Sequence, residues 1–112
     1  MSVKDRKKFE DRARIMKALA HPSRLMMVDE LSRGERCVCE LTEMVGADIS
    51  TVSKHLSVLK DAGIVDSRKE GVQVFYRLKA PCVLNVFECI EAVQDEKQRC
   101  ETPLSSAADV GE

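Results

Sequence analysis

The sequence predicts a mainly α-helical fold with a small β-hairpin, and three neighbouring segments carry this prediction. A helix is expected between Asp48, whose carboxylate can accept hydrogen bonds from first-turn amides, and Gly63, which suits a left-handed helix end. A shorter helix over residues 38–45 precedes it, and two alternating runs around Glu70-Gly71 follow it. This order predicts a winged helix-turn-helix.

The predicted helix over residues 48–63 has one apolar and one polar side. Val52, Leu56 and Leu59 recur at helical spacing and are expected in the core. Short hydroxyl and cationic side chains crowd the other side, where they would let the helix approach phosphates and base edges. The candidate DNA-contacting residues here are Ser50, Thr51, Ser53, Lys54 and His55. An ordinary amphipathic helix with a solvated polar face is the alternative.

The predicted hairpin joins residues 64–69 to residues 72–78, with Gly71 supplying the positive φ of the turn. Arg68 and Lys69 would then lie near its tip, within reach of phosphates or a minor groove. The alternative is a small solvated ribbon whose charges are incidental.

Length and composition indicate one compact domain. A chain of 112 residues can bury one core, expected over residues 5–98, and residues 99–112 resemble a flexible tail. No apolar run approaches the roughly 18 residues of a membrane span, and no export signal is recognisable, so we expect a cytoplasmic protein without a membrane partner.

The charges are unevenly distributed although the net charge is −1. Residues 50–80 carry six Lys or Arg and three Asp or Glu, whereas residues 81–112 carry two and seven. A basic segment on an otherwise acidic body favours binding of a polyanion on one face.

Further helices are predicted at both ends, and their apolar surfaces are broad. One covers residues 5–19, a second starts at Pro22, and the last covers residues 82–98. The apolar positions are Phe9, Ala13, Met16 and Leu19 in the first, Leu25, Met26, Val28 and Leu31 in the second, and Val83, Val86, Phe87, Ile90 and Val93 in the last. The flanking helices predict a symmetric homodimer, which would place two recognition helices on the half-sites of an operator.

Five motifs in this order resemble the ArsR/SmtB family of metalloregulatory repressors, and the arsenic repressors in particular. They are Leu-Ala-His-Pro-Ser-Arg-Leu at residues 19–25, Cys-Val-Cys-Glu-Leu at 37–41, Ser-Thr-Val-Ser-Lys-His-Leu at 50–56, Leu-Lys-Asp-Ala-Gly-Ile-Val at 59–65 and Val-Phe-Tyr-Arg-Leu at 74–78. The resemblance implies a dimeric repressor that holds double-stranded operator DNA when empty and releases it when an inducer binds. Ile49 departs from the polar residue that many relatives carry there.

Cys37 and Cys39 are the first candidate inducer ligands. Residues two apart in an ideal helix point in nearly opposite directions, so the two thiols could share one ion only if the first helical turn opened. Such an opening would disturb the recognition helix, the helix predicted over residues 48–63, across the turn at Gly46. The helix N-terminus is expected to lower the pKa of the thiols. Thiolates favour soft ions, and As(III) or Sb(III) is the expected inducer.

A trigonal arsenic site needs a third thiolate, but Thr42 stands where arsenic repressors have their next cysteine. Cys82, Cys89 or Cys100, from the same chain or its partner, could supply it, or it could be missing. Cys82 and Cys89, seven residues apart, are expected on the same side of the last helix. Buried thiols in the dimer interface are the alternative for these two.

Other functions are less well supported by the residues. The zinc site implied by the resemblance would use histidine in the last helix, which has none, and the cadmium and lead site would use N-terminal cysteines, which residues 1–36 lack. His21 is expected at a helix entry. A redox or persulfide switch at the cysteines stays open, as does a DNA-binding domain whose cysteines only pack. A Cys-x-Cys thiol enzyme lacks an acid–base pair, so we expect no enzyme and no required cofactor.

Overall fold

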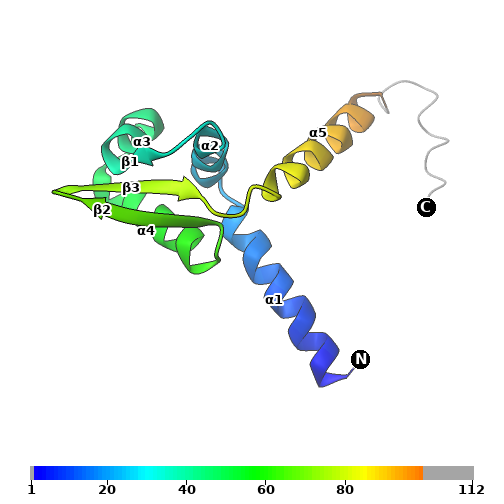
Figure 1. The fold of residues 1–112 in the computed structure, drawn as a ribbon. Coiled ribbons are helices and arrows are strands. Elements are labelled where there is room, and N and C mark those ends of the chain that lie inside the picture. The colour runs from blue at the N-terminus through cyan, green and yellow to red at the C-terminus, as the bar shows by residue number, and fades with distance from the viewer. Residues whose placement is uncertain (1, 100–112) are drawn as a thin grey trace. The chain divides into compact units, whose positions relative to one another are not determined.

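The computed structural model describes residues 2–99, and they form the predicted mainly helical fold with a hairpin (Figure 1). The chain divides into two compact units, one ending at Pro81 and one beginning at Cys82. Cys100 and almost all of the predicted tail lie outside the described residues. The elements are α1 (Val3–Leu19), α2 (Pro22–Leu31), β1 (Arg36–Cys37), α3 (Val38–Val45), α4 (Ile49–Asp61), β2 (Val65–Glu70), β3 (Gln73–Leu78) and α5 (Val83–Arg99).

The first two helices begin at side-chain caps. α1 starts two residues earlier than predicted, because Ser2 Oγ accepts a hydrogen bond from the Asp5 amide at 3.2 Å. Pro22 opens α2 as predicted, and the preceding His21 caps it by accepting the Ser23 amide on Nδ1 at 3.0 Å. His21 is therefore a helix-entry residue, as expected.

The core of the first unit forms where α2, α3 and α4 pack together. Its fully buried side chains include all three apolar residues predicted from the helix over residues 48–63, Val52, Leu56 and Leu59, with Leu41, Met27 and Val28. The prediction for Met26 was wrong: this side chain is 46% exposed and Met27 is buried instead. Neighbouring helical residues point about 100° apart, so a small error in the assigned face exchanges the two.

The turn between α3 and α4 is short. Gly46 adopts the left-handed conformation at φ 77° and ends α3, as predicted. Two further residues lead into α4, which ends before Gly63 at φ 82°. α3 and α4 therefore form the expected helix-turn-helix.

The sheet has three strands rather than the predicted two. β2 and β3 pair from Val65 opposite Leu78 to Glu70 opposite Gln73, with Gly71 at φ 64° in the turn. The turn residues are thus Gly71 and Val72, one position later than predicted. β1 pairs with the other side of β3, which gives the order β1-β3-β2. The sheet lies beside α3 and α4 (Figure 1).

The second unit contains α5, which corresponds to the helix predicted over residues 82–98. Cys82 precedes the helix instead of belonging to its first turn, so the same-side relation expected for Cys82 and Cys89 does not follow from helical spacing. Both thiols are exposed. Among the described residues, no helix is long and apolar enough to cross a membrane.

Candidate nucleic-acid interface and thiol site

The N-terminal half of α4 presents an exposed polar surface. Ser50, Thr51, Ser53 and Lys54 are all exposed, while Val52 between them is buried. Lys54 forms no ion pair with any residue in the range that the structure describes. Four of the five side chains of α4 expected to meet DNA therefore stand together on one side of the helix.

Asp48 caps α4 in a different way from the one predicted. Its carboxylate accepts no hydrogen bond from a backbone amide. Instead it accepts the hydroxyls of Ser50 at 2.6 Å and Thr51 at 2.5 Å, and these bonds lower the pKa of Asp48. The first-turn amides of α4 consequently have no side-chain cap, although the Asp48 carboxylate lies beside the hydroxyls of this turn.

His55 is half-buried against α2. Arg24 donates a hydrogen bond from Nη1 to His55 Nδ1 at 3.1 Å, and the rings of His21 and His55 lie 4.3 Å apart between centroids. Burial lowers the pKa of His55, and the charges of His21 and Arg24 lower it further. Arg24 also donates from Nε to the Ala18 carbonyl at 2.7 Å. His55 thus ties the recognition helix to α1 and α2, and its predicted contact with DNA stays a prediction.

The hairpin carries exposed cations, but most are already paired. Arg68 bonds Glu35 at 2.7 Å and Glu70 at 3.2 Å, and its guanidinium lies 4.8 Å from the Phe75 ring centroid. These carboxylates raise the pKa of Arg68 above its already high value. Lys69 is exposed.

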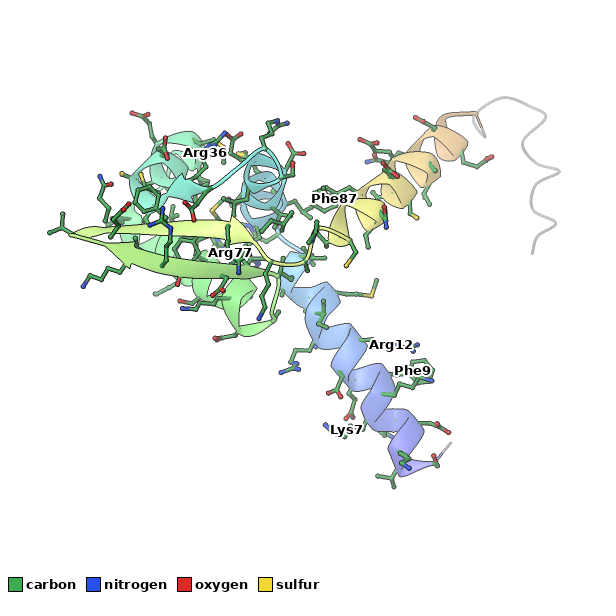
Figure 2. The ribbon with its side chains drawn as sticks, in the orientation of Figure 1. Lys7, Phe9, Arg12, Arg36, Arg77 and Phe87 are labelled. Atoms are coloured by element: carbon green, nitrogen blue, oxygen red, sulfur yellow. The ribbon has the colours of Figure 1, made fainter. Side chains whose placement is uncertain are left out.

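Two further polar contacts brace the hairpin, and no local sequence pattern predicted them. Lys60 Nζ donates to the Ser67 hydroxyl at 2.8 Å, which links α4 to β2. Arg77, labelled in Figure 2, pairs with Asp66 across the two strands at 3.3 Å.

The thiols of Cys37 and Cys39 lie side by side. Their sulfur atoms are 2.6 Å apart, Cys37 being buried and Cys39 exposed. The expectation that they point in opposite directions was wrong, because Cys37 is not helical: it belongs to β1, has an extended backbone and only caps α3. No helical turn has to open for both sulfurs to reach one ion.

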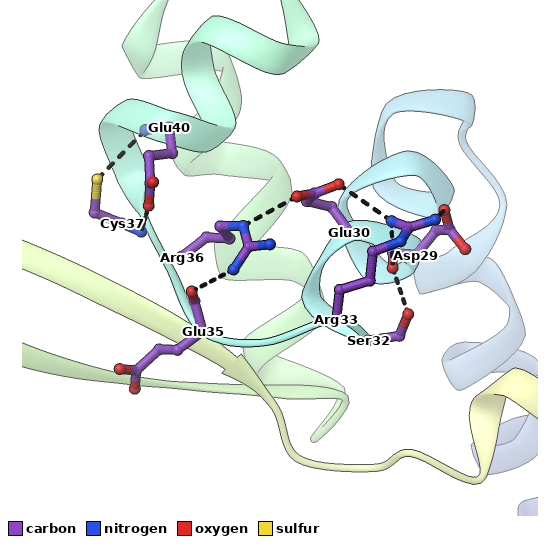
Figure 3. Close-up of polar contacts among 8 residues, drawn as sticks. All are labelled: Asp29, Glu30, Ser32, Arg33, Glu35, Arg36, Cys37 and Glu40. Atoms are coloured by element: carbon purple, nitrogen blue, oxygen red, sulfur yellow. Dashed lines mark hydrogen bonds and ion pairs between the residues drawn. The ribbon is translucent and has the colours of Figure 1, made fainter.

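Cys37 also takes part in a capping box (Figure 3). Its amide donates to Glu40 Oε1 at 2.9 Å, and the Glu40 amide donates to Cys37 Sγ at 3.4 Å. The hydrogen bond with Cys39 raises the pKa of Cys37, and burial raises it further. The predicted lowering of the Cys37 pKa was therefore wrong.

Ion pairs hold the segment that leads into β1. Arg36 Nε bonds Glu30 Oε2 at 3.0 Å, and Glu30 also pairs with Arg33 at 3.2 Å (Figure 3). Glu35, which lies between these two arginines in the chain, is the partner of Arg68 on β2. The backbone before the thiol pair is thus connected to both α2 and the hairpin.

A hollow of about 310 Å³ adjoins the thiol pair. Its other walls are the start of α4, including Ile49 and Ser53, and the hairpin from Val72 to Val74. Sequence reasoning missed this hollow, since it depends on the pairing of β1 with β3. No group of three or more metal-binding side chains occurs in the part of the chain that the structure describes.

Comparison with known proteins identifies the family. A model described as bacterial regulatory protein, arsR family, matches residues 21–67. A biofilm growth-associated repressor of Agrobacterium fabrum is 40% identical over 87 residues, covering 78% of this chain and 74% of that protein. The chain belongs to the arsR family.

Other ArsR-family relatives carry different names. An arsenical resistance operon repressor of Staphylococcus aureus is 32% identical and covers 82% of this chain and 88% of its own. A cadmium resistance transcriptional regulatory protein of Listeria innocua is 39% identical over 70% of this chain and 57% of its own. The chain spans 37% of the length of the regulator Rv0324 of Mycobacterium tuberculosis, which is 38% identical over 75% of this chain.

A solved structure, described as that of a possible ArsR-family transcriptional regulator, supports the fold. The homodimeric winged helix-turn-helix DNA-binding domain Mb0332 of Mycobacterium bovis matches with a TM-score of 0.74 at 34% identity, over 88% of this chain and 91% of that domain. This ArsR-family chain is accordingly a DNA-binding transcriptional regulator and not an enzyme.

Proposed function

We propose that this protein is a homodimeric repressor that leaves its operator when As(III) or Sb(III) binds the thiols of Cys37 and Cys39. The observation that carries the proposal is the 2.6 Å separation of the two sulfurs at the entry to the helix-turn-helix. Two sulfurs that share one ion at about 2.3 Å each are at most about 4.6 Å apart. The pair thus offers two soft ligands to one ion.

The DNA contacts would come mainly from the exposed side of α4. Its uncapped amides suit a phosphate, and the hydroxyls of Ser50 and Thr51 can turn from Asp48 towards the DNA. Ser53 and Lys54 complete this surface. Arg68, Lys69 and His55 would contribute less, because Arg68 is paired with two carboxylates and His55 packs on α2.

Exposed apolar side chains in both units support a homodimer. Phe9 and Met16 on α1 are 50% and 65% exposed, and Phe9 lies beside Arg12 (Figure 2). On α5, the exposed large apolar residues are Val86, Ile90 and Val93. Covering them with a second copy removes this surface from water and agrees with the homodimeric M. bovis domain.

Release would follow from the position of the thiol pair. An ion held by Cys37 and Cys39 would lie at the wall of the hollow that Ile49 on α4 and Val72 in the hairpin turn also line. A ligand that fits only one relative position of these two DNA-reading elements changes the balance between DNA-binding and free states. This mechanism of release differs from the one expected from the sequence, because it does not require a helical turn to open.

A third thiolate for arsenic would come from Cys82, Cys89 or Cys100, of this chain or its partner. Cys82 and Cys89 are exposed and thus accessible to an ion. Removing each in turn distinguishes these three candidates, since the loss of a true ligand weakens As(III) binding.

A thiol redox switch is the second candidate function. Adjacent sulfurs, of which Cys39 is exposed, also favour oxidation to a disulfide or a persulfide-derived bridge. Cd(II) is a further thiophilic inducer to be tested, given the name of the Listeria relative.

The test is operator release measured by fluorescence anisotropy on the protein's own promoter fragment under reducing conditions. As(III), Sb(III), Cd(II), Zn(II) and a mild oxidant are titrated separately. We expect release by As(III) and Sb(III), and we expect Cys37→Ser and Cys39→Ser to bind DNA normally without release. Release by the oxidant alone, reversed by a reductant, would support the redox switch instead.

A further inference from the structure

A hollow separate from the thiol pair lies between α1, α2 and α4, and none of its lining residues lines the hollow at the thiols. Its volume of about 370 Å³ lies within the range for small-molecule pockets, about 300 to 1,000 Å³. Ala18, which is buried, and Val58 on α4, which is 39% exposed, give it an apolar side. The hollow therefore has room for an organic group and apolar surface for that group to cover.

Positive charge gathers around this hollow. Arg14 and Lys17 on α1 are three residues apart, so they share one side of that helix, and they line the hollow together with Arg24 of α2. Asp61 is the one carboxylate among the described residues of its lining. None of these four side chains forms an ion pair within residues 2–99. Three cations against one carboxylate leave a surplus of positive charge that an anion can neutralise.

Arg24 connects the hollow to α4. Its half-buried guanidinium donates to the Ala18 carbonyl at 2.7 Å and to His55 Nδ1 at 3.1 Å, and both acceptors are uncharged. Burial lowers the pKa of His55 most, and the charges of His21 and Arg24 lower it further. The positive charge of Arg24 thus acts on α4 and is not matched by a carboxylate.

We propose that this hollow binds a small organic anion, with the anionic group on Arg14, Lys17 and Arg24 and the apolar part against Val58. The site is independent of the thiol pair, so the inference goes beyond the proposed function. A charged acceptor bonds a guanidinium more strongly than a neutral imidazole does. The bound anion therefore draws Arg24 away from His55, loosens the connection of α2 to α4 and weakens operator binding.

The first experiment measures the binding of octanoate and octyl phosphate to the full chain by calorimetry, below the concentrations at which they form micelles. Acetate and inorganic phosphate carry the charge without the apolar part, and octanol carries the apolar part without the charge. We expect at least one octyl anion to bind at least about tenfold more tightly than its short counterpart and than octanol, which corresponds to about 1.4 kcal/mol. If neither octyl anion exceeds these controls, the proposal is overturned.

A pair of double variants tests the cations. Arg14→Ala with Lys17→Ala should weaken binding of the octyl anion at least about tenfold, because both charges at the hollow are lost. Lys4→Ala with Lys8→Ala removes the same charge from exposed positions of α1 that do not line the hollow, and should leave binding unchanged. Equal losses in the two double variants would mean that only the net charge of α1 matters, which contradicts a defined site.

The pKa of His55, followed by NMR of its imidazole, tests the contact with Arg24. Because the charge of Arg24 helps to lower this pKa, a bound anion should raise it towards its ordinary value. A merely structural effect of the ligand elsewhere on the surface would not move it. An unchanged pKa of His55 in the saturated complex would place the anion away from Arg24 and contradict the proposal.

Operator release, measured by fluorescence anisotropy, separates this site from the thiols and from the DNA surface. The octyl anion should release the operator from the native chain and equally from Cys37→Ser, but not from the Arg14→Ala, Lys17→Ala variant. Loss of release in Cys37→Ser would assign the effect to the thiol pair and overturn this inference. If the Arg14→Ala, Lys17→Ala variant without ligand binds the operator several-fold more weakly and with a smaller salt slope, these cations contact DNA phosphates, and that result also overturns it.

Discussion

The helices α3 and α4 belong to one helix-turn-helix, but side chains treat the free backbone amides at their N-termini differently. At α3, Cys37 and Glu40 cap the backbone reciprocally, and the chemistry left over is a pair of sulfurs. At α4, Asp48 bonds two hydroxyls and leaves the first amides uncapped. A closed helix end with thiols suits a soft ligand, whereas an open end with hydroxyls and Lys54 suits a phosphate. In the proposed function, the same local element therefore serves inducer binding in one place and DNA binding in the other.

The largest expected effect concerns the thiols at α3 and depends on pH. Because the Cys39 hydrogen bond and burial raise the pKa of Cys37, its thiol enters binding protonated around neutral pH. Cd(II) must expel this proton, so the Cys37 thiol alone should make the apparent affinity fall about tenfold for each pH unit between pH 8 and 6, and any further protonated thiol ligand makes the fall steeper. Arsenous acid carries hydroxides that take up the proton as water, so its affinity should stay nearly constant. Competition titrations at three pH values measure both. If the affinities for Cd(II) and As(III) changed with pH to the same extent, the assignment of the Cys37 thiol as a ligand would be contradicted.

The next effect concerns the open end of α4. Lys54→Ala should weaken operator binding about tenfold at low salt, and the slope of log K against log[salt] should fall by about 0.9 for each phosphate that Lys54 neutralises in the native chain. Arg68→Ala should have a smaller effect, since Glu35 and Glu70 already pair with Arg68. Lys7→Ala, in an i,i+4 pair on α1, serves as the control. Anisotropy across a salt series gives all three slopes. A larger loss for Arg68→Ala than for Lys54→Ala would reverse the proposed division between helix and wing.

The thermal stability of two variants tests the same difference between the starts of α3 and α4. Glu40→Ala removes the bond to the Cys37 amide and should lower Tm by a few degrees. Asp48→Ala removes no hydrogen bond to a backbone amide and should lower Tm by clearly less. Calorimetry of the two variants at one protein concentration tests this order. Equal losses would mean that the two helix ends do not differ in the way described.

The smallest expected effect comes from removing a carboxylate that pairs with Arg68. Glu35→Gln keeps the shape of the side chain but removes one of the two carboxylates that pair with Arg68. Operator binding should tighten about two- to threefold at low salt, and its salt dependence should become steeper. The combination with Arg68→Ala should cancel the gain. If the gain remained in the double variant, Arg68 would not be its source.

Local sequence patterns predicted most of the fold and part of the site. Helical spacing and end signals identified α1 to α5, and alternation with Gly71 identified the hairpin, because these features depend on neighbouring residues. β1 has only two residues and forms through pairing with β3, so it left no pattern. The placement of Cys37 beside Cys39 depends on that strand and was missed with it. The inward position of His55 was missed for a related reason, since only packing against His21 and Arg24 reveals it.

The most direct test of the central claim is the affinity of As(III) for the free protein and for the operator complex. If the thiol pair and the DNA surface are coupled, As(III) must bind the complex more weakly, by the same factor by which As(III) weakens operator binding. We predict that the two factors are equal in the native chain and that, in Cys37→Ser, As(III) no longer weakens operator binding. Equal As(III) affinity for the free and the DNA-bound protein would contradict the account.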